Sequence, residues 1–390
     1  MFFQKRIQHR EQNLLNYNIA IYFGTNVSTI YQFEQWIPIF NLLNSNKKII
    51  VITRQVSTYD WMMKHTDYNI RYCCELDDLI DTYESSSLKC ILYVNHGVRN
   101  FQSLMYRNAL HIHINHGESE KVSTISNQVN AYNYVFIVGN AALDKYRYNL
   151  LQVDESKFIQ IGRPQLEHIQ NIDIQLPKDR KIILYAPTWE GTHTSMNYTS
   201  LDEYGMKIIH TILSAPEYYL IYKPHPNTGS RHTSTKNINK AIVKLLNSHK
   251  NGSVVQSGNI NSLFKYTDIA IIDNSAVAID YLQIDKPMLM VDMFHRAKDR
   301  QYPPTIGCAV HLLSSSNINQ LISIIDTNIE KDALQLARDK VKKYFLGNYT
   351  YTNKESTTLF LTSISNICKE RDILIDKLQK IDKEVCLNDV

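Results

Sequence analysis

The fold of this chain follows from the stretch His111-Ile112-His113-Ile114-Asn115-His116-Gly117. Polar and apolar residues alternate from His111 to Ile114, which predicts a strand, and the His-Gly pair interrupts that alternation. His116 therefore stands at the carboxyl end of a strand, where open α/β sheets bind ligands and a catalytic base is well placed. Turn chemistry is the simpler explanation for a lone histidine beside a glycine. A second histidine, in Lys223-Pro224-His225-Pro226, again follows a strand-like run and favours the catalytic interpretation.

Strand-like and helix-like segments alternate on both sides of this stretch. The first half holds strand-like runs at residues 17–24, 47–53, 70–74, 88–94, 134–138 and 158–161, and the pattern restarts at 181–187, 218–223, 253–255, 268–272 and 288–291. Such alternation is typical of parallel sheets flanked by helices. The sequence therefore predicts an α/β protein with two halves of similar size.

Composition shifts divide the chain further. The polar stretch 171–180 is the candidate linker, so we expect one α/β domain over residues 1–170 and a second over 178–350. After Pro303-Pro304 the chain is expected to be helical, ending in an amphipathic helix within residues 351–390. Its apolar seam consists of Ile364, Ile367, Leu374, Leu378, Ile381 and Val385, interrupted by Arg371. Because the seam is short and interrupted, packing back on the first half is favoured over a coiled coil.

The bulk composition indicates a globular protein. With 44% hydrophobic residues, a 390-residue chain can fill at least one large core. The formal net charge of +4 is spread along the sequence, so no nucleic-acid-binding arm is indicated. Mild basicity would suit an anionic substrate or a membrane surface without requiring either.

Cysteine usage and the first residues point to a cytoplasmic protein. The six cysteines show no C-x-x-C pair and no metal-ligand spacing, which fits a reduced chain. No signal peptide is recognisable, and no run approaches the ~18 apolar residues of a membrane-spanning helix. A peripheral contact with the inner face of the membrane is a further hypothesis, with a frayed first helix as the simpler explanation. The residues that would make this contact are Phe2, Phe3, Lys5, Arg6, Ile7 and Arg10.

Three further segments carry polar residues directly after predicted strands. A proline-terminated strand presents Thr188 and Trp189 in the following loop. In Lys223-Pro224-His225-Pro226 the two prolines stiffen the backbone around the histidine, which suits a preorganised anion site beside a lysine. Asp273-Asn274-Ser275 lies between a buried strand and a helix, where free amides and the helix dipole favour a phosphate. Helix capping alone also explains Asn274 and Ser275.

Signatures of several other enzyme classes are missing from the sequence. The chain has no G-x-x-x-x-G-K-[ST] phosphate loop, no G-x-G-x-x-G fingerprint, no G-x-S-x-G elbow and no H-E-x-x-H zinc helix. Kinase, dehydrogenase and hydrolase interpretations therefore lose their usual support, and the sequence predicts no metal ligands.

Taken in their order along the chain, the four segments resemble the CDP-glycerol glycerophosphotransferase family of teichoic-acid and bacterial capsule synthesis. The resemblance extends from the His-Gly stretch to Phe345-Leu346-Gly347-Asn348-Tyr349, and the order is more specific than any single motif. It implies a glycosyltransferase-B-like architecture of two Rossmann-like domains facing a cleft. It also implies a cell-envelope transferase that moves glycerol phosphate from CDP-glycerol to a hydroxyl of a saccharide or polymer acceptor, lipid-linked or not, and releases CMP.

The resemblance implies roles for individual residues as well. His116 would be the general base on the acceptor hydroxyl, and a protonated His225 would contact the donor diphosphate as the second catalytic residue. The donor site would include Thr188, Trp189, Lys223, Asn274 and Ser275, and the acceptor side would include Asn115, Glu118, Ser119 and Lys121. The chemistry requires no cofactor beyond the donor substrate, and dependence on a divalent metal is left open.

Two segments depart from the family pattern. The family commonly has Thr-Asp-Tyr-Ser-Ser where this chain has Ile272-Asp273-Asn274-Ser275-Ala276, so one phosphate-binding hydroxyl is absent. The family's Gly-x-Pro-Arg-x-Asp stands here as Gly162-Arg163-Pro164-Gln165-Leu166-Glu167.

Several alternatives stay open within this interpretation. We expect a priming enzyme that adds one unit, because 390 residues leave little room beyond the two halves and a terminal helix. The rivals are a polymerising glycerophosphotransferase, a ribitol-phosphate transferase and a nucleotide-sugar glycosyltransferase of the same fold. A non-catalytic scaffold is disfavoured by the two histidines. The released product separates the main rivals, since ordinary glycosyl transfer releases a nucleoside diphosphate instead of CMP.

Overall fold

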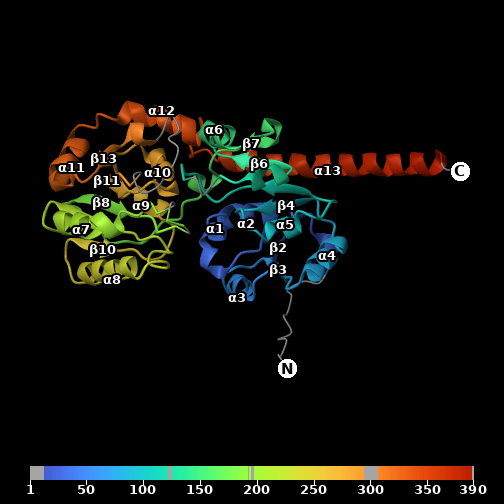
Figure 1. The fold of residues 1–390 in the computed structure, drawn as a ribbon, viewed down its shortest axis with the longest axis horizontal. Coiled ribbons are helices and arrows are strands. Elements are labelled where there is room, and N and C mark those ends of the chain that lie inside the picture. The colour runs from blue at the N-terminus through green and yellow to red at the C-terminus, as the bar shows by residue number, and fades with distance from the viewer. Residues whose placement is uncertain (1–12, 122–124, 192, 195–196, 294–305, 389–390) are drawn as a thin grey trace, which may run out of the picture.

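The protein is built on two parallel sheets that lie side by side, each flanked by helices (Figure 1). The computed structural model describes residues 13–121, 125–191, 193–194, 197–293 and 306–388, with side chains up to Ile381. The predicted α/β class with two parallel sheets is confirmed.

Within the described residues the first sheet has seven parallel strands in the order β3-β2-β1-β4-β5-β6-β7. The strands are β1 (Ile19–Phe23), β2 (Ile49–Thr53), β3 (Asn69–Tyr72), β4 (Cys90–Tyr93), β5 (Leu110–His113), β6 (Tyr134–Ile137) and β7 (Phe158–Gln160). The helices of this half are α1 (Tyr31–Glu34), α2 (Ile37–Asn46), α3 (Val56–His65), α4 (Leu76–Glu84), α5 (Asn100–Ser103) and α6 (Asn140–Asn149). The strand order reverses between β1 and β4, so the carboxyl ends of these strands form a topological switch point.

Both faces of the first sheet are covered, which explains why its strands are continuously apolar. All five residues of β1 are buried. Alternate side chains point to opposite faces, so Ile19, Ile21 and Phe23 join one core cluster while Ala20 and Tyr22 join another. The sequence pattern of buried strands between helices follows directly from this two-sided packing.

The second sheet has six parallel strands within the described residues, in the order β10-β9-β8-β11-β12-β13. The strands are β8 (Lys181–Ala186), β9 (Tyr218–Tyr222), β10 (Gly252–Val254), β11 (Ile269–Ile272), β12 (Met288–Val291) and β13 (His311–Leu313). The helices that follow β8 are α7 (Met206–Leu213), α8 (Thr233–Asn247), α9 (Asn261–Phe264), α10 (Ala276–Tyr281), α11 (Leu321–Glu330) and α12 (Gln335–Leu346). Here the switch point lies between β8 and β11, which end in register at Ala186 and Ile272.

The prediction that the chain is only helical after Pro303-Pro304 is wrong. His311–Leu313 forms β13, which pairs in parallel with β12 at the edge of the second sheet. A strand of three residues is too short to give a periodic signal, and pairing with β12 rather than local propensity determines its conformation.

The terminal helix α13 (Glu355–Asn388) begins on the first half and then leaves it. Phe360, Ile364, Ile367 and Cys368 are buried in a core cluster of the first sheet. Glu167 accepts hydrogen bonds from the amides of Ser356 and Thr357 at 2.8 Å each, so it satisfies the first amides of this helix. Farther along, Ile373, Leu374, Leu378 and Ile381 are exposed, and Figure 1 shows this part extending away from the body of the protein.

Membrane contact was expected, if anywhere, at the first ten residues, which lie outside the described part of the chain. Among the helices of the described residues, none combines the length and the apolar character needed to cross a bilayer.

Candidate active site

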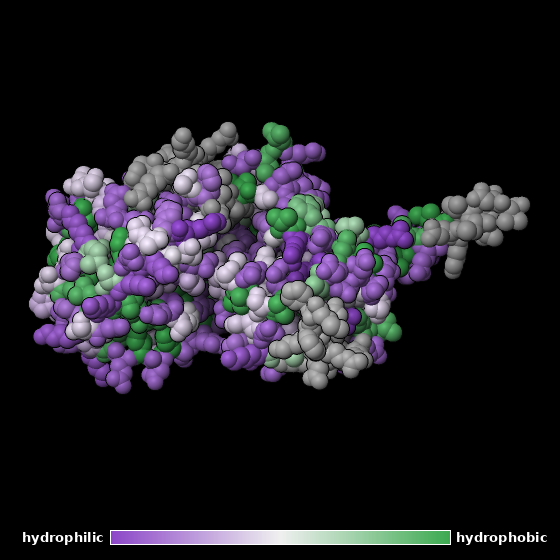
Figure 2. Space-filling model, turned by 60° about the horizontal axis from the view of Figure 1, so that its bottom comes forward, coloured by the Kyte–Doolittle hydropathy of each residue, from purple (hydrophilic) through white to green (hydrophobic). Residues whose placement is uncertain are grey.

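The four predicted segments lie where the two sheets face each other, and the surface is hollowed between the halves (Figure 2). They follow β5 in the first half, and β8, β9 and β11 in the second. Side-chain contacts join the halves directly. Lys121 Nζ of the first half donates to Thr188 Oγ1 at 2.8 Å, and the Tyr31 ring contacts the ring of His225.

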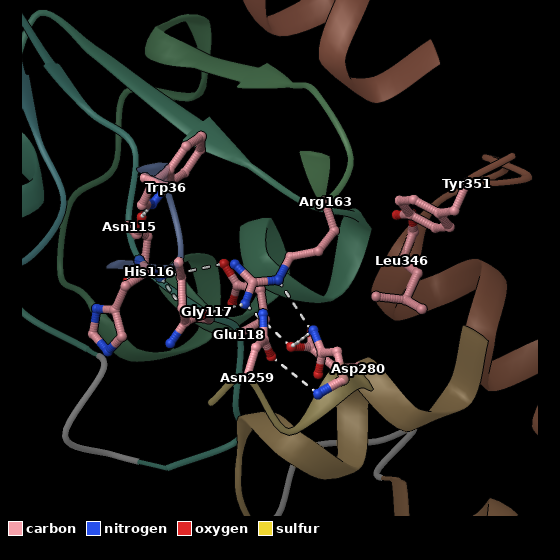
Figure 3. Close-up of polar contacts among 12 residues, drawn as sticks. Trp36, Asn115, His116, Gly117, Glu118, Arg163, Asn259, Asp280, Leu346 and Tyr351 are labelled. Atoms are coloured by element: carbon pink, nitrogen blue, oxygen red, sulfur yellow. Dashed lines mark hydrogen bonds and ion pairs between the residues drawn. The ribbon is translucent and has the colours of Figure 1, made fainter. Parts of the chain in front are cut away.

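The loop that carries His116 is held by its own neighbours (Figure 3). Asn115 has a φ of 53°, a left-handed conformation that asparagine adopts more readily than most residues. The indole of Trp36 donates to the Asn115 carbonyl at 2.6 Å, and the Asn115 side chain donates to the Gly117 carbonyl at 2.9 Å. The same side chain accepts from the His116 amide at 2.8 Å. The backbone around the histidine is thereby fixed in one shape.

The His116 ring is oriented as a base. Its Nδ1 lies 3.1 Å from the carbonyl oxygen of Val94, which can only accept, so Nδ1 carries the proton and Nε2 keeps its lone pair. Burial lowers the pKa of His116 to about 4, the Val94 carbonyl opposes that shift, and the charges of Arg163 and Lys145 lower the pKa further. His116 is therefore neutral at pH 7 and able to accept a proton.

His225 presents the opposite tautomer. Its Nδ1 accepts a hydrogen bond from the Asn227 amide at 3.1 Å, which leaves the proton on Nε2. Burial lowers the pKa of His225 to about 3, and the charges of Lys121 and Lys223 add to that effect. This lowered pKa favours a neutral ring at pH 7 over the protonated His225 that the sequence analysis expected. What this residue offers an anion is one neutral N–H donor.

Tyr31 is a residue that sequence reasoning missed. Its ring makes edge contacts with both histidines, with centroids 6.2 Å from His116 and 5.3 Å from His225. On the other side His225 stacks on Trp189 at 5.9 Å. Tyr31 follows β1 at the switch point of the first sheet, and no local motif marks it, since only the tertiary fold places it between two distant histidines.

Thr188 is tied to a buried carboxylate at the switch point of the second sheet. The Thr188 and Ser200 amides donate to Asp273 Oδ2 at 2.8 and 3.1 Å. Burial raises the pKa of Asp273 to about 6, although these amides and Lys121 oppose the shift. Asp273 therefore fixes the loop after β8. Lys121, which was expected on the acceptor side, bonds Thr188 and so lies against the segments expected to bind the donor.

The loop after β9 is held by a second buried carboxylate. Glu190 accepts from the amides of Gly229 and His232 at 3.0 and 3.2 Å, which fixes the turn between His225 and α8. Lys223 is 6% exposed and its Nζ donates to the Gln256 carbonyl at 3.2 Å. Burial lowers the pKa of Lys223 to about 8, so it is still mostly cationic at pH 7.

Asn274 and Ser275 are both buried at the start of α10. Ser275 occupies the cap position with an extended backbone, but its side chain makes no capping hydrogen bond. Its buried Oγ has no hydrogen-bond partner within the described residues. Simple capping therefore does not account for the side chain of Ser275.

Three of the four residues expected on the acceptor side, Asn115, Glu118 and Ser119, are packed within the first half itself, whereas Lys121 bonds Thr188 of the second half. Glu118 forms a buried ion pair with Lys145 of α6 at 2.9 Å. Asn115 is engaged with its own loop, as described above, and Ser119 is buried beside Glu118. No group of three or more His, Cys, Asp or Glu side chains that could hold a metal occurs within the described residues.

Two α/β halves whose strand ends face each other define the architecture of glycosyltransferases of the B type, and solved structures with this fold are similar to the chain. The wall teichoic acid polymerase TagF is 14% identical with a TM-score of 0.60, over 91% of this chain and 90% of that one. A glycosyltransferase from Rickettsia africae is 15% identical with a TM-score of 0.55, over 91% and 98%. A UDP-GlcNAc 2-epimerase from Neisseria meningitidis is 14% identical with a TM-score of 0.57, over 90% and 100%. At these identities the likeness establishes the fold alone.

The sequence itself establishes the family. The profile of the CDP-Glycerol:Poly(glycerophosphate) glycerophosphotransferase family matches residues 9–305. The chain belongs to this family, which confirms the resemblance drawn from the four motifs. A search of curated proteins finds no match.

Proposed function

We propose that the protein transfers glycerol phosphate from CDP-glycerol to a hydroxyl of a cell-surface polymer or its linker and releases CMP. The observation that carries this proposal is the pair of opposite tautomers at the interface of the halves. His116 keeps a lone pair on Nε2, whereas His225 keeps a proton there. A phosphoryl transfer needs such a pair, since one group must take a proton from the nucleophile while another neutralises charge on the phosphates.

In the proposed reaction, the acceptor hydroxyl gives its proton to His116 Nε2 as its oxygen attacks the phosphorus that bears glycerol. The bond from that phosphorus to the bridging oxygen breaks, and the bridging oxygen leaves with CMP. The His225 Nε2–H donates to the diphosphate, and the ammonium groups of Lys223 and Lys121 lie close enough to His225 to affect its pKa. Positioning and charge neutralisation supply the catalysis in this scheme.

The donor would lie against the second half. Thr188 bonds Lys121 of the first half, Lys223 is near enough to His225 to lower its pKa, and the Ser275 hydroxyl is buried without a partner among the described residues. A structure of TagF soaked with CDPG exists for the same fold, at 14% identity and a TM-score of 0.59. Family membership and this arrangement support CDP-glycerol as the donor, with Thr188, Trp189, Lys223, Asn274 and Ser275 as its contacts.

Addition of a single unit is the finer part of the proposal. The likeness to a polymerase does not decide this question, because 14% identity carries the fold alone. We also propose that the acceptor is a saccharide or polymer met in the cytoplasm, where a lipid-linked acceptor would bring the protein to the inner face of the membrane.

Mass spectrometry of products from CDP-glycerol and a panel of saccharide acceptors tests the proposal. We expect acceptor mass to rise by one glycerol phosphate and CMP to appear in equal amount. A series of products that differ by successive glycerol phosphate units would show polymerisation instead of single addition. Transfer only from CDP-ribitol, or release of a nucleoside diphosphate from a nucleotide sugar, would overturn the donor assignment.

A further inference from the structure

Arg163 is a nearly fully buried cation between the two halves. It follows β7, where the chain passes from the first half towards the second, and is 3% exposed. Its Nε and Nη2 donate to the two carboxylate oxygens of Asp280 at 3.0 and 3.2 Å, and Nη2 also donates to Gln35 Oε1 at 3.1 Å. Figure 3 shows the side chain reaching Asp280 beside the His116 loop. One guanidinium thus connects both halves.

Each partner of Arg163 is adjacent to a part of the candidate site. Gln35 precedes Trp36, whose indole holds the Asn115 carbonyl next to His116. Asp280 belongs to α10, whose start carries Ser275. The ion pair therefore links the support of the base to the helix expected to bind the donor.

Gly117 brings the same two parts into direct contact. A Cβ atom at Gly117 would lie 3.2 Å from the Ala276 Cβ and 3.4 Å from Arg163 Nη2. A distance of 3.2 Å is shorter than nine in ten Cβ contacts in real proteins. A methyl group at Gly117 would require its neighbours to shift by a few tenths of an ångström, so the base loop, the guanidinium and the first turn of α10 are closely packed.

We propose that Arg163 is a positioning residue, which sets the distance between the His116 loop and α10 through its fork on Asp280 and its bond to Gln35. The proposal rests on the proposed function for the reaction that it serves. A planar guanidinium suits this task because it binds a carboxylate in a fixed bidentate geometry that a lysine cannot reproduce. Proton transfer and in-line attack are sensitive to displacements of about 1 Å, which can cost on the order of 10²-fold in rate.

The matched pair Arg163→Lys and Arg338→Lys tests this role. Arg338 is 2% exposed and donates to Asp332 Oδ1 at 2.8 Å, and its second carboxylate partner, Asp285, also lies within the second half. Both variants lose a buried bidentate arginine, so both should lose thermal stability. Only Arg163→Lys should lower kcat, by about 10²-fold. KM for CDP-glycerol should change little, because the expected donor contacts all lie in the second half.

Hydrogen exchange gives a second readout that does not depend on activity. Arg163→Lys should speed amide exchange in peptides covering residues 112–118 and 273–281, whereas Arg338→Lys should leave the 112–118 peptide at the wild-type rate. If the wild-type protein shows no transfer from CDP-glycerol, the proposed function fails while exchange still tests the positioning role. Wild-type kcat in Arg163→Lys, an equal kcat loss in Arg338→Lys, or unchanged exchange in both peptides would overturn the proposal.

Discussion

Two pairs of histidines in this protein resemble each other in burial and differ in their partners. His96 and His113 stack with ring centroids 3.9 Å apart, and none of their ring nitrogens has a hydrogen-bond partner within the described residues. His116 and His225 stand on either side of Tyr31, and each has a backbone partner on Nδ1. Burial lowers the pKa of all four residues.

A lowered pKa alone therefore does not identify a catalytic histidine. Burial is the first cause of the shift in both pairs. The pairs differ because a backbone partner fixes one nitrogen in His116 and His225, which gives the other a defined role as acceptor or donor. His113 is the last residue of β5 and points into the core, whereas His116 comes three residues later, beyond the strand end. Three residues along the chain thus separate a structural histidine from a candidate base.

The largest expected effect separates these two neighbours. His116→Ala should lower CMP release from CDP-glycerol by 10²-fold to 10⁴-fold, in the range of a lost general base. His113→Phe should stay within about threefold of wild type, because phenylalanine can keep the stack on Tyr132 and buries no unpaired nitrogen. Steady-state CMP release measures both. Equal losses in the two variants would remove the distinction between the pairs.

The next effect concerns the donor role of His225. His225→Phe keeps an aromatic ring against Trp189 but loses the Nε2–H group. A hydrogen bond to a charged group contributes about 1.5–3 kcal/mol, so CDP-glycerol affinity should fall by about tenfold to a hundredfold. Calorimetric titration with CDP-glycerol measures this loss. Wild-type affinity would show that His225 does not contact the diphosphate.

A smaller effect tests Tyr31, whose ring contacts both His116 and His225. Tyr31→Ala removes two aromatic contacts of about 0.5–1.5 kcal/mol each, so kcat/KM should fall by about tenfold. Tyr31→Phe keeps both contacts and should retain wild-type kcat/KM. If both variants lose the same activity, the phenol hydroxyl rather than the ring is what matters.

The smallest effect is a difference in acid stability caused by the stacked pair. The pKa of His113 is lowered in the fold, while in the unfolded chain it returns to ~6.5. The unfolded state therefore binds more protons below that pH, so the free energy of unfolding falls as pH drops through 6.5. His113→Phe removes this term, so its loss of stability between pH 7 and pH 5 should be smaller than that of wild type. Urea unfolding at both pH values measures it, and equal losses would contradict the buried neutral state.

Much of the fold was predictable because it rests on local patterns. Strands buried on both faces read as continuous apolar runs, and helices between them restore the 3.6-residue period. Strand β13 was not predicted because three residues are too few to show a periodic pattern. Its conformation comes from pairing with β12. The terminal helix was predictable from its seam, whereas its contacts with the first half, which continue to the Lys89–Asp372 ion pair, depend on the tertiary fold.

The candidate site was predictable only where residue type and strand end coincide, as for His116, His225 and Thr188. Tyr31, Asp273 and Arg163 were missed as functional because their partners lie far away in the sequence. The lowered pKa of His225 also could not be predicted, since burial and the nearby charges of Lys121 and Lys223 are tertiary properties. The sequence thus indicates which chemical groups are present, whereas the fold determines their protonation states and the distances between them.

The central claim is that His116 accepts a proton after the donor has bound. Binding and single-turnover release of CMP, measured on the same sample of His116→Ala with CDP-glycerol and acceptor, test it most directly. We expect His116→Ala to bind CDP-glycerol with wild-type affinity and to release CMP at least ~10²-fold more slowly. Release at the wild-type rate, or loss of CDP-glycerol binding in this variant, would contradict it.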